Sequence, residues 1–257
     1  MLTISTLVLA LGAAPTVLGL TLNDGKLRVV EFTGGAAAAP KERLVADQPC
    51  PVTTAQWSAA HDRVLVTSAC QLSLLTLSTK KAQVLPASPA ENAIVQWATD
   101  GAVLAIARVM GDPAEAFELK GGKWVSIEKS ADANLKSDRR LLKRQPEGAR
   151  KPSADEAKAL PPGFEWQVRG DGAYAAALQG TDACFLTPPI ALRSGKEWKV
   201  LIEQADCAAT QRAGGWLMVD AEDGRVWLAA IDSGVAEQFP AGLRFPRLVA
   251  KGVRFAP

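Results

Sequence analysis

The sequence predicts an all-β fold built from repeated four-stranded antiparallel units. The main observation is a short polar turn containing Asp, followed each time by an apolar, strand-like run. Asp24, Asp62 and Asp100 occur at equal intervals, and Asp171 and Asp223 continue the series with extra residues between them. A period of about 40 residues with four short strands per unit is typical of a β-propeller blade. We therefore predict a β-propeller of about five four-stranded blades, with an open β-meander or a sandwich as the alternative.

The first two units show the pattern most simply. In the first, Asn23, Asp24 and Gly25 tolerate the positive φ that a tight turn needs, and apolar runs flank them at residues 15–22 and 26–32. In the second, short runs rich in Val, Leu and Thr alternate with polar turns. Its predicted strands span residues 52–57, 64–69, 72–77 and 82–85. Strands that follow one another so closely form an antiparallel meander.

The later units repeat this order with longer connections. The predicted strands are residues 94–97, 103–107, 116–119 and 124–127 in the third unit, 164–168, 173–178, 190–192 and 198–202 in the fourth, and 216–219 and 226–231 in the fifth. Four tryptophans precede the Asp turns of their units, namely Trp57, Trp97, Trp166 and Trp216. Aromatic residues at equivalent positions are expected to pack between blades, and a ligand platform is the alternative.

The phrase around these turns resembles that of a known repeat. Trp57-Ser-Ala-Ala-His-Asp and Trp97-Ala-Thr-Asp-Gly are similar to the W-S-P-D-G phrase of WD40-like and TolB-like β-propeller repeats. The resemblance covers residues 16–232 outside one insertion. It lacks the Pro of that phrase and the Trp-Asp dipeptide and structural His of WD40 repeats. The resemblance therefore implies the fold and no particular activity.

One segment, residues 128–163, departs from the repeat. It is charged, rich in Lys, Arg, Ala and Pro, and poor in aromatic residues. Residues 134–144 (NLKSDRRLLKR) are expected to form a short basic helix. We predict a single propeller domain over residues 15–257, in which residues 128–163 are a partly helical or disordered insertion.

The N-terminal residues and the overall charge indicate the compartment. Residues 2–11 are an apolar stretch of signal-peptide length followed by small residues. We expect residues 1–14 to be a signal peptide and the mature chain, without a transmembrane segment, to be periplasmic or extracellular; a buried first strand is the alternative. The net charge of +2 argues against nucleic acid or an anionic membrane as a partner.

Four cysteines fit an oxidising compartment. Cys50 and Cys70 are symmetric about the turn near residue 60, and Cys184 and Cys207 are symmetric about the turn near residue 195. Residues equidistant from a hairpin turn face each other within disulfide reach. We predict the disulfides Cys50–Cys70 and Cys184–Cys207. A metal site of four thiolates is disfavoured because no C-x2-C pair occurs.

Catalytic signatures are not found in the sequence. The single histidine, His61, lies in a turn position of the repeat, which favours a structural role over that of a general base or metal ligand. The Asp turns lack the carboxylate spacing of a calcium loop and fit hairpin turns. We therefore predict no catalytic residue, no metal and no cofactor.

The extra chain length points to a binding face. In a meander, all the short Asp turns would lie at one end of the sheets, and the long connections and the cysteines at the other. We predict a non-catalytic binding or assembly scaffold, a monomer, that binds a protein or small-molecule ligand on this loop face, with the insertion as a lid or arm. The candidate binding residues are Arg108, Asp112, Arg139, Arg140, Gln179 and Asp182. The alternative is a propeller-fold hydrolase or lyase with its site at the axial channel.

Overall fold

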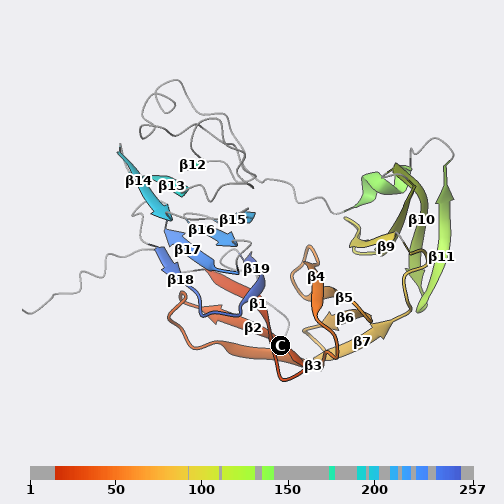
Figure 1. Cartoon of the computed structure of the whole chain (residues 1–257), viewed down its shortest axis with the longest axis horizontal. Coiled ribbons are helices and arrows are strands. Elements are labelled where there is room, and N and C mark those ends of the chain that lie inside the picture. Colours follow the sequence, from red (N-terminus) through yellow and green to blue (C-terminus); the bar gives the residue numbers. More distant parts are fainter. Residues whose placement is uncertain are drawn as a thin grey trace, which may run out of the picture. The chain divides into compact units, whose positions relative to one another are not determined.

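The computed structural model of the chain describes residues 15–91, 93–109, 112–130, 135–141, 174–176, 190–194, 197–202, 209–213, 216–220, 224–230 and 236–249. These residues form five sheets, four of four strands and one of three, and they confirm the predicted all-β propeller blades (Figure 1). The chain divides into two compact units, one centred on β4–β11 and one on β12–β19, to both of which the first sheet contributes. We describe each unit by itself.

The first sheet combines strands from both ends of the sequence. Its order is β19-β1-β2-β3, and in it Thr16 pairs with Val249. The pairing is irregular at Gly19, where Leu18 faces Arg247 and Leu20 faces Arg244. A Cβ on Gly19 would overlap with a terminal methyl group of the buried Leu243, so a larger residue here would have to displace that side chain. The strands are β1 (Thr16–Asn23), β2 (Lys26–Thr33), β3 (Lys41–Asp47) and β19 (Arg244–Val249).

This arrangement changes which two strands the Asp turn joins in the first sheet. The repeat pattern predicts that every Asp turn lies between the first and second strands of its unit. Because β19 is the first strand of its sheet, β1 is the second, and the Asp24 turn joins the second and third strands. Likewise β15 precedes β16 in the fifth sheet, so the turn at Gly224 also joins second and third strands. Successive turns in a meander alternate between the two ends of the sheet. The expectation that all the Asp turns lie at one end is therefore wrong for the first and fifth sheets.

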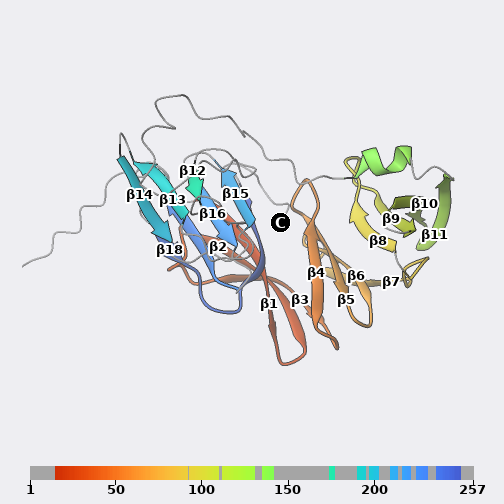
Figure 2. The ribbon, with the colours of Figure 1, turned by 45° about the horizontal axis from the view of Figure 1, so that its top comes forward.

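The second sheet follows the prediction closely. Its order is β4-β5-β6-β7, with β4 (Val52–Trp57), β5 (Arg63–Ser68), β6 (Leu72–Thr76) and β7 (Lys81–Leu85) (Figure 2). Trp57 pairs with Val64 across the first turn. His61 has a φ of 59° in that turn and its backbone N–H donates to the Ser58 carbonyl. The polar turn residues thus set the register of the sheet.

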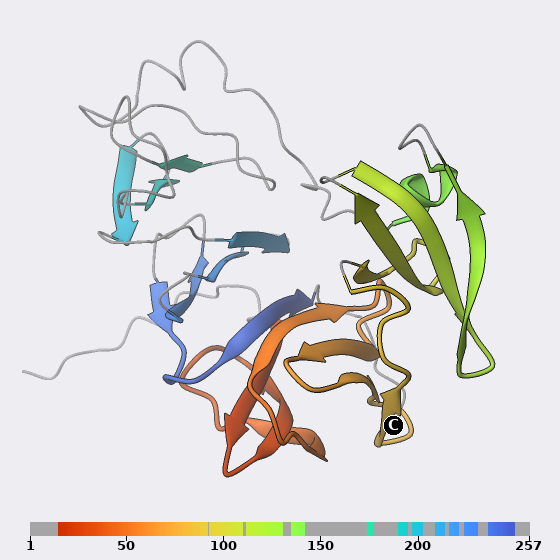
Figure 3. The same ribbon diagram turned by 45° about the vertical axis from the view of Figure 1, so that its right-hand side comes forward.

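The third sheet has the order β11-β10-β9-β8, with β8 (Ala93–Trp97), β9 (Val103–Val109), β10 (Asp112–Lys120) and β11 (Lys123–Lys129). Figure 3 shows the long hairpin of β10 and β11 in green. Its turn is formed by Gly121 and Gly122, both at positive φ. The predicted strands ended at residue 107 and began again at residue 116, but β9 extends to Val109 and β10 begins at Asp112, so both strands are longer than expected.

One face of the third sheet packs on the second sheet. Trp97 is fully buried in a cluster with Leu65 and Leu72 of the second sheet and Val103 of its own. Its indole N–H donates a hydrogen bond of 2.9 Å to the Gln56 carbonyl. The predicted inter-blade role of this tryptophan is confirmed.

The other face of the third sheet is covered by the segment 135–141, which includes the 3-10 helix η1 (Lys136–Arg140). Leu135 and Leu141 are buried there in a cluster with Leu104 and Ile106 of β9. The other members of the cluster are Ala98 and Ala116, and Ala102 and Ile127 pack against it. Figure 2 shows η1 as a green coil beside β8 and β9. The described start of the range 128–163 thus belongs to this blade, since Glu128 lies in β11 and residues 135–141 fill its outer face.

The remaining sheets belong to the other unit. The fourth has β12 (Tyr174–Ala176), β13 (Ile190–Ser194) and β14 (Glu197–Ile202); the fifth has β15 (Ala209–Ala213), β16 (Trp216–Asp220), β17 (Val226–Ala230) and β18 (Ala236–Gln238). A core cluster joins the fifth sheet to the first through Met218, Leu228, Phe32 and Phe239. Trp216 packs against this cluster from the second strand of its sheet, not from the first as expected.

Candidate binding face

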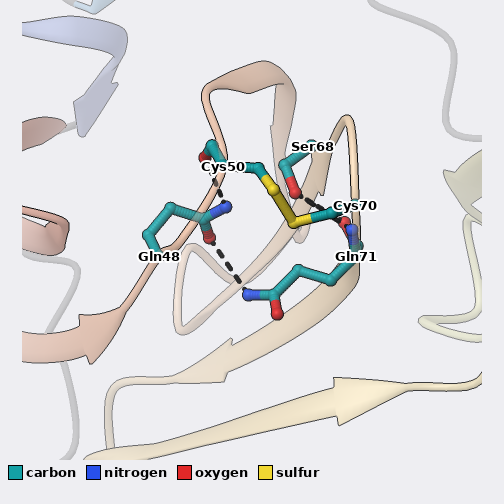
Figure 4. Close-up of a disulfide and its surroundings, with 5 residues drawn as sticks. All are labelled: Gln48, Cys50, Ser68, Cys70 and Gln71. Carbon is teal, nitrogen blue, oxygen red and sulfur yellow. Dashed lines mark hydrogen bonds between the residues drawn. A yellow bond between two sulfur atoms is a disulfide. The ribbon is translucent and has the colours of Figure 1, made fainter.

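The predicted disulfide Cys50–Cys70 is present and lies at the open end of the second sheet (Figure 4). Cys50 comes just before β4, and Cys70 lies in the turn between β5 and β6. Their Cα atoms are 6.0 Å apart, within the usual range for a disulfide. The bond therefore ties the entry into the first strand to the exit from the second.

Gln48 organises the surroundings of this disulfide, although it is a polar residue only 3% exposed. Its backbone N–H donates to the Gly25 carbonyl at 2.8 Å. Its side-chain Nε2 donates to the Cys50 carbonyl at 2.8 Å, and its Oε1 accepts from Gln71 Nε2 at 3.4 Å (Figure 4). Because a buried amide is costly unless it is hydrogen-bonded, these partners fix the path of the chain into β4.

Cys70 lies in a turn that is stabilised by hydrogen bonds between Ser68 and Gln71. The Ser68 N–H donates to the Gln71 carbonyl at 2.9 Å, and the Ser68 hydroxyl donates to the same carbonyl at 3.0 Å. The Gln71 N–H lies 3.2 Å from the Ser68 hydroxyl oxygen. This turn stays defined by its own contacts, as hydroxyl-stabilised turns do.

The contact of Gln48 with Gly25 brings a third segment to the same place. Residues 22–25, 47–51 and 68–71 together form a surface that we call the disulfide end. Its ionisable side chains are Asp24 and Asp47, and Asp47 forms an ion pair with Lys26 next to it. Leu22 is 46% exposed, and Pro49, Pro51, Ala69 and Cys70 are also exposed.

This composition decides what the disulfide end can do. Lys26 pairs with Asp47, and Arg28 donates to the Asn23 carbonyl at 3.3 Å, so two basic side chains border these segments. The three segments also expose Leu22, two prolines and Ala69, and exposed apolar groups on linked segments suit contact with a protein surface.

Four of the six predicted binding residues lie in the described part of the chain. Arg108 and Asp112 are at the facing ends of β9 and β10, where Arg108 pairs with Pro113 and Asp112 with Val109. They are therefore strand residues beside a short connection. Gln179 and Asp182 lie outside the described residues, as do Cys184 and Cys207, so the second predicted disulfide stays a prediction.

The other two predicted binding residues are on η1 and differ from each other. Arg139 is exposed. Arg140 donates to Asp100 at 2.7 Å and to Glu118 at 3.2 Å, and the Thr99 N–H donates to its carbonyl. Arg140 therefore fastens the segment 135–141 to the third sheet, at the end where β8 and β9 are joined.

Carboxylates of the third sheet and its turns accept the hydrogen bonds that attach residues 136–140 to this sheet. The hydrogen bond from Arg140, together with the backbone N–H of Ala102, lowers the pKa of Asp100. At the start of η1, Glu128 accepts from the N–H groups of Lys136 and Ser137, both at 2.7 Å. Hydrogen bonds from Ser137 and from the Lys136 N–H lower the pKa of Glu128. Ionised carboxylates thus hold both ends of the segment.

The remaining sequence features are structural where the chain is described. Asp62 accepts from the Ser58 hydroxyl at 2.8 Å, which agrees with a turn role for this residue. Within the described residues, no group of three or more His, Cys, Asp or Glu side chains is arranged to hold a metal ion. In the same part of the chain, no helix has the length and hydrophobicity needed to cross a membrane.

The sequence analysis missed Gln48 and Leu22. A glutamine two residues before a cysteine carries no special signal, because its importance comes from the Gly25 turn that meets it in three dimensions. Leu22 reads as part of an apolar strand, and only the structure shows that the strand has passed the edge of the core by this residue.

Solved structures that are similar to this chain share little sequence with it. No protein-family profile and no curated protein matches the sequence. Among solved structures, the chain is similar to TolB from Acinetobacter baumannii, with 13% identity over 92% of this chain and 67% of that one and a TM-score of 0.45. It is also similar to a putative TolB from Agrobacterium tumefaciens (12% identity, 88% and 70% coverage, TM-score 0.27). The tricorn protease gives 8% identity, 87% and 22% coverage and a TM-score of 0.30.

The chain is thus similar to TolB-like β-propeller proteins, as the repeat phrase implied. It spans about two thirds of each TolB structure and about a fifth of the tricorn protease. At these identities and TM-scores the similarity gives no information on activity, substrate or partner.

Proposed function

We propose that this protein is a non-catalytic binding scaffold and that its disulfide end is the surface that contacts a protein partner. The observation that carries the proposal is the construction of that end: the Cys50–Cys70 bond and the Gln48 hydrogen bonds link three segments, on which Leu22, Pro49, Pro51 and Ala69 are exposed. Rigid surfaces of this kind lose little entropy on binding, so exposed apolar groups on them contribute well to affinity.

The proposed compartment is the periplasm or the cell exterior. A disulfide in the folded chain is typical of proteins in oxidising compartments. The apolar N-terminal stretch supports export, since it has the length and following small residues of a signal peptide.

Residue-specific cross-linking tests this proposal. A photoreactive side chain placed at Ala69, on the disulfide end, should capture a protein partner from an envelope extract, whereas one placed at Lys80, in the turn between β6 and β7, should not. The variant Leu22→Glu should abolish capture at Ala69, because a charge replaces the exposed apolar group.

Val125→Glu is the matched control, because Val125 is 44% exposed and lies in β11, away from these segments. This variant should capture the partner as the wild type does. Equal capture from Ala69 and Lys80, or capture that survives Leu22→Glu, would show that the disulfide end is not the binding surface. Thermal stabilisation by a small molecule without any protein captured would instead assign a ligand site.

A further inference from the structure

We propose that the Cys50–Cys70 disulfide is a reducible latch: a dithiol reductant cleaves it at Cys70 and frees the segment before β4 while the sheets stay folded. The proposal concerns regulation of the disulfide end, and its biological meaning rests on the proposed binding function. The opening itself can be measured without a partner.

Access decides which sulfur is attacked. Cys70 is exposed and Cys50 is half-buried. In thiol–disulfide exchange, a thiolate attacks one sulfur and the electron pair of the S–S bond leaves with the other. A thiolate of the reductant would therefore bond to Cys70 Sγ, and Cys50 Sγ would leave as a thiolate and take a proton from water.

The second thiol of the reductant completes the reaction. It displaces Cys70 from the mixed disulfide, so that the reductant becomes a disulfide and both cysteines become thiols. Two electrons pass from the dithiol to the protein, and no other reactant is needed.

The two sides of the broken bond differ in what else holds them. The Cys70 side keeps its turn through the Ser68 and Gln71 contacts. The Cys50 side is held by Gln48, whose N–H donates to the Gly25 carbonyl at 2.8 Å and whose side chain bonds to the Cys50 carbonyl and, at 3.4 Å, to Gln71. Reduction removes the one covalent link of this side and leaves it on those hydrogen bonds alone, so the segment before β4 should open more often than the sheets, while the Cys70 turn stays in place.

The strand pairing limits how far the release extends. Val52 pairs with Ser68, but the next pair is Thr54 with Thr67, so the ladder is irregular at Thr53. From Thr54 to Trp57 the pairing with β5 is regular. A β-bulge is a natural point for a strand end to stop fraying, because the ladder is already interrupted there. Opening should thus be confined to residues 48–53, which are the segment before β4 and the first two residues of β4.

Native-state reduction of the full chain tests the latch. The protein is incubated with dithiothreitol without denaturant, its thiols are alkylated, and the peptides that contain Cys50 and Cys70 are mapped apart from those of Cys184 and Cys207. Hydrogen exchange is followed in parallel. We expect both thiols to be labelled and the protection of the amides of Gln48, Cys50, Val52 and Thr53 to fall about tenfold or more, with residues 64–67 and 103–107 unchanged.

Two results would overturn the latch. In one, Cys50 and Cys70 become reactive only when residues 64–67 and 103–107 also lose protection, which would make the bond a part of global stability. In the other, the bond is reduced but residues 48–53 keep their protection. The double variant Cys50→Ser/Cys70→Ser should show the opened exchange pattern without reductant; if it does not fold, the wild-type measurement decides. Since these readouts involve no partner, failure of the latch is distinct from failure of the binding surface in the Leu22→Glu test.

Discussion

The guanidinium carbon of Arg63 lies 4.7 Å from the centre of the Trp97 ring, so a residue of β5 covers the tryptophan that fills the space between the second and third sheets. Arg63 also donates to the Gly101 carbonyl at 3.4 Å. A cation over an indole face and a hydrogen bond to a neighbouring turn both link the two sheets. Arg63 therefore links the second sheet to the third through these two contacts, which we call the Arg63 clasp.

Replacing Arg63 should weaken this contact. Arg63→Ala is expected to lower the free energy of unfolding by about 1–2 kcal/mol, since it removes a cation–π contact and a hydrogen bond. Urea denaturation measures the change. Arg28→Ala serves as the control, because it removes a surface ion pair with Glu42 that should contribute less than about 1 kcal/mol. Equal losses for the two variants would argue against the clasp.

The side chains of Gln48 and Gln71 are hydrogen-bonded to each other, so replacing each in turn shows which of them contributes more to stability. Gln48→Ala should cost about 1–3 kcal/mol, because it removes two side-chain hydrogen bonds at a buried position. Gln71→Ala removes a single long hydrogen bond and should cost under about 1 kcal/mol. Thermal unfolding of both variants tests the order, and a larger loss for Gln71→Ala would contradict the assigned role of Gln48.

Leu135 tests whether the start of the range 128–163 is part of the third blade. It is 2% exposed, so Leu135→Ala should cost about 2–4 kcal/mol by leaving a cavity. Arg139→Ala, on the exposed side of η1, should change stability by no more than about 0.5 kcal/mol. Denaturation curves that coincide for Leu135→Ala and the wild type would mean that the segment packs elsewhere. A variant that deletes part of the range 128–163 should accordingly keep residues 135–141 if the third sheet is to remain folded.

The Asp100–Arg140 contact predicts a defined pH dependence. The hydrogen bond from Arg140 lowers the pKa of Asp100 in the folded chain. A carboxyl with a lowered pKa adds stability above its unfolded pKa of about 4, and loses it as the pH falls through the folded value. The wild type should therefore be more stable than Asp100→Asn at neutral pH, and the two should converge below about pH 4. Urea denaturation of both proteins at neutral pH and below about pH 4 measures the difference in their free energy of unfolding. Arg140→Ala should remove most of the difference, and parallel pH profiles for wild type and Asp100→Asn would refute the contact.

Local sequence signals predicted the second and third sheets well. Turn residues such as His61 and Gly101, followed by alternating apolar residues, determine strand ends and register without help from distant parts of the chain. The position of Cys50 and Cys70 about a turn predicted their disulfide for the same reason, since a hairpin is a local structure.

The missed features depend on distant contacts. The pairing of Thr16 with Val249 has no local signature, and it changed the phase of the first sheet. Asp112 and Pro113 suggested a loop, yet pairing with β9 keeps them in a strand. Leu135 and Leu141 were hidden in a charged segment because their partners, Leu104 and Ile106, belong to another strand pair.

The sheet that contains β19 and β1 has a consequence for how the protein folds. Until residues 244–249 have been made, β1 has an unpaired edge, and an apolar strand with an open edge invites pairing with other chains. Contacts between such distant residues also form slowly, because a long loop must close first. Chains shortened before β19 should therefore aggregate, and β1 should need protection from other chains until β19 has been synthesised and has paired with it.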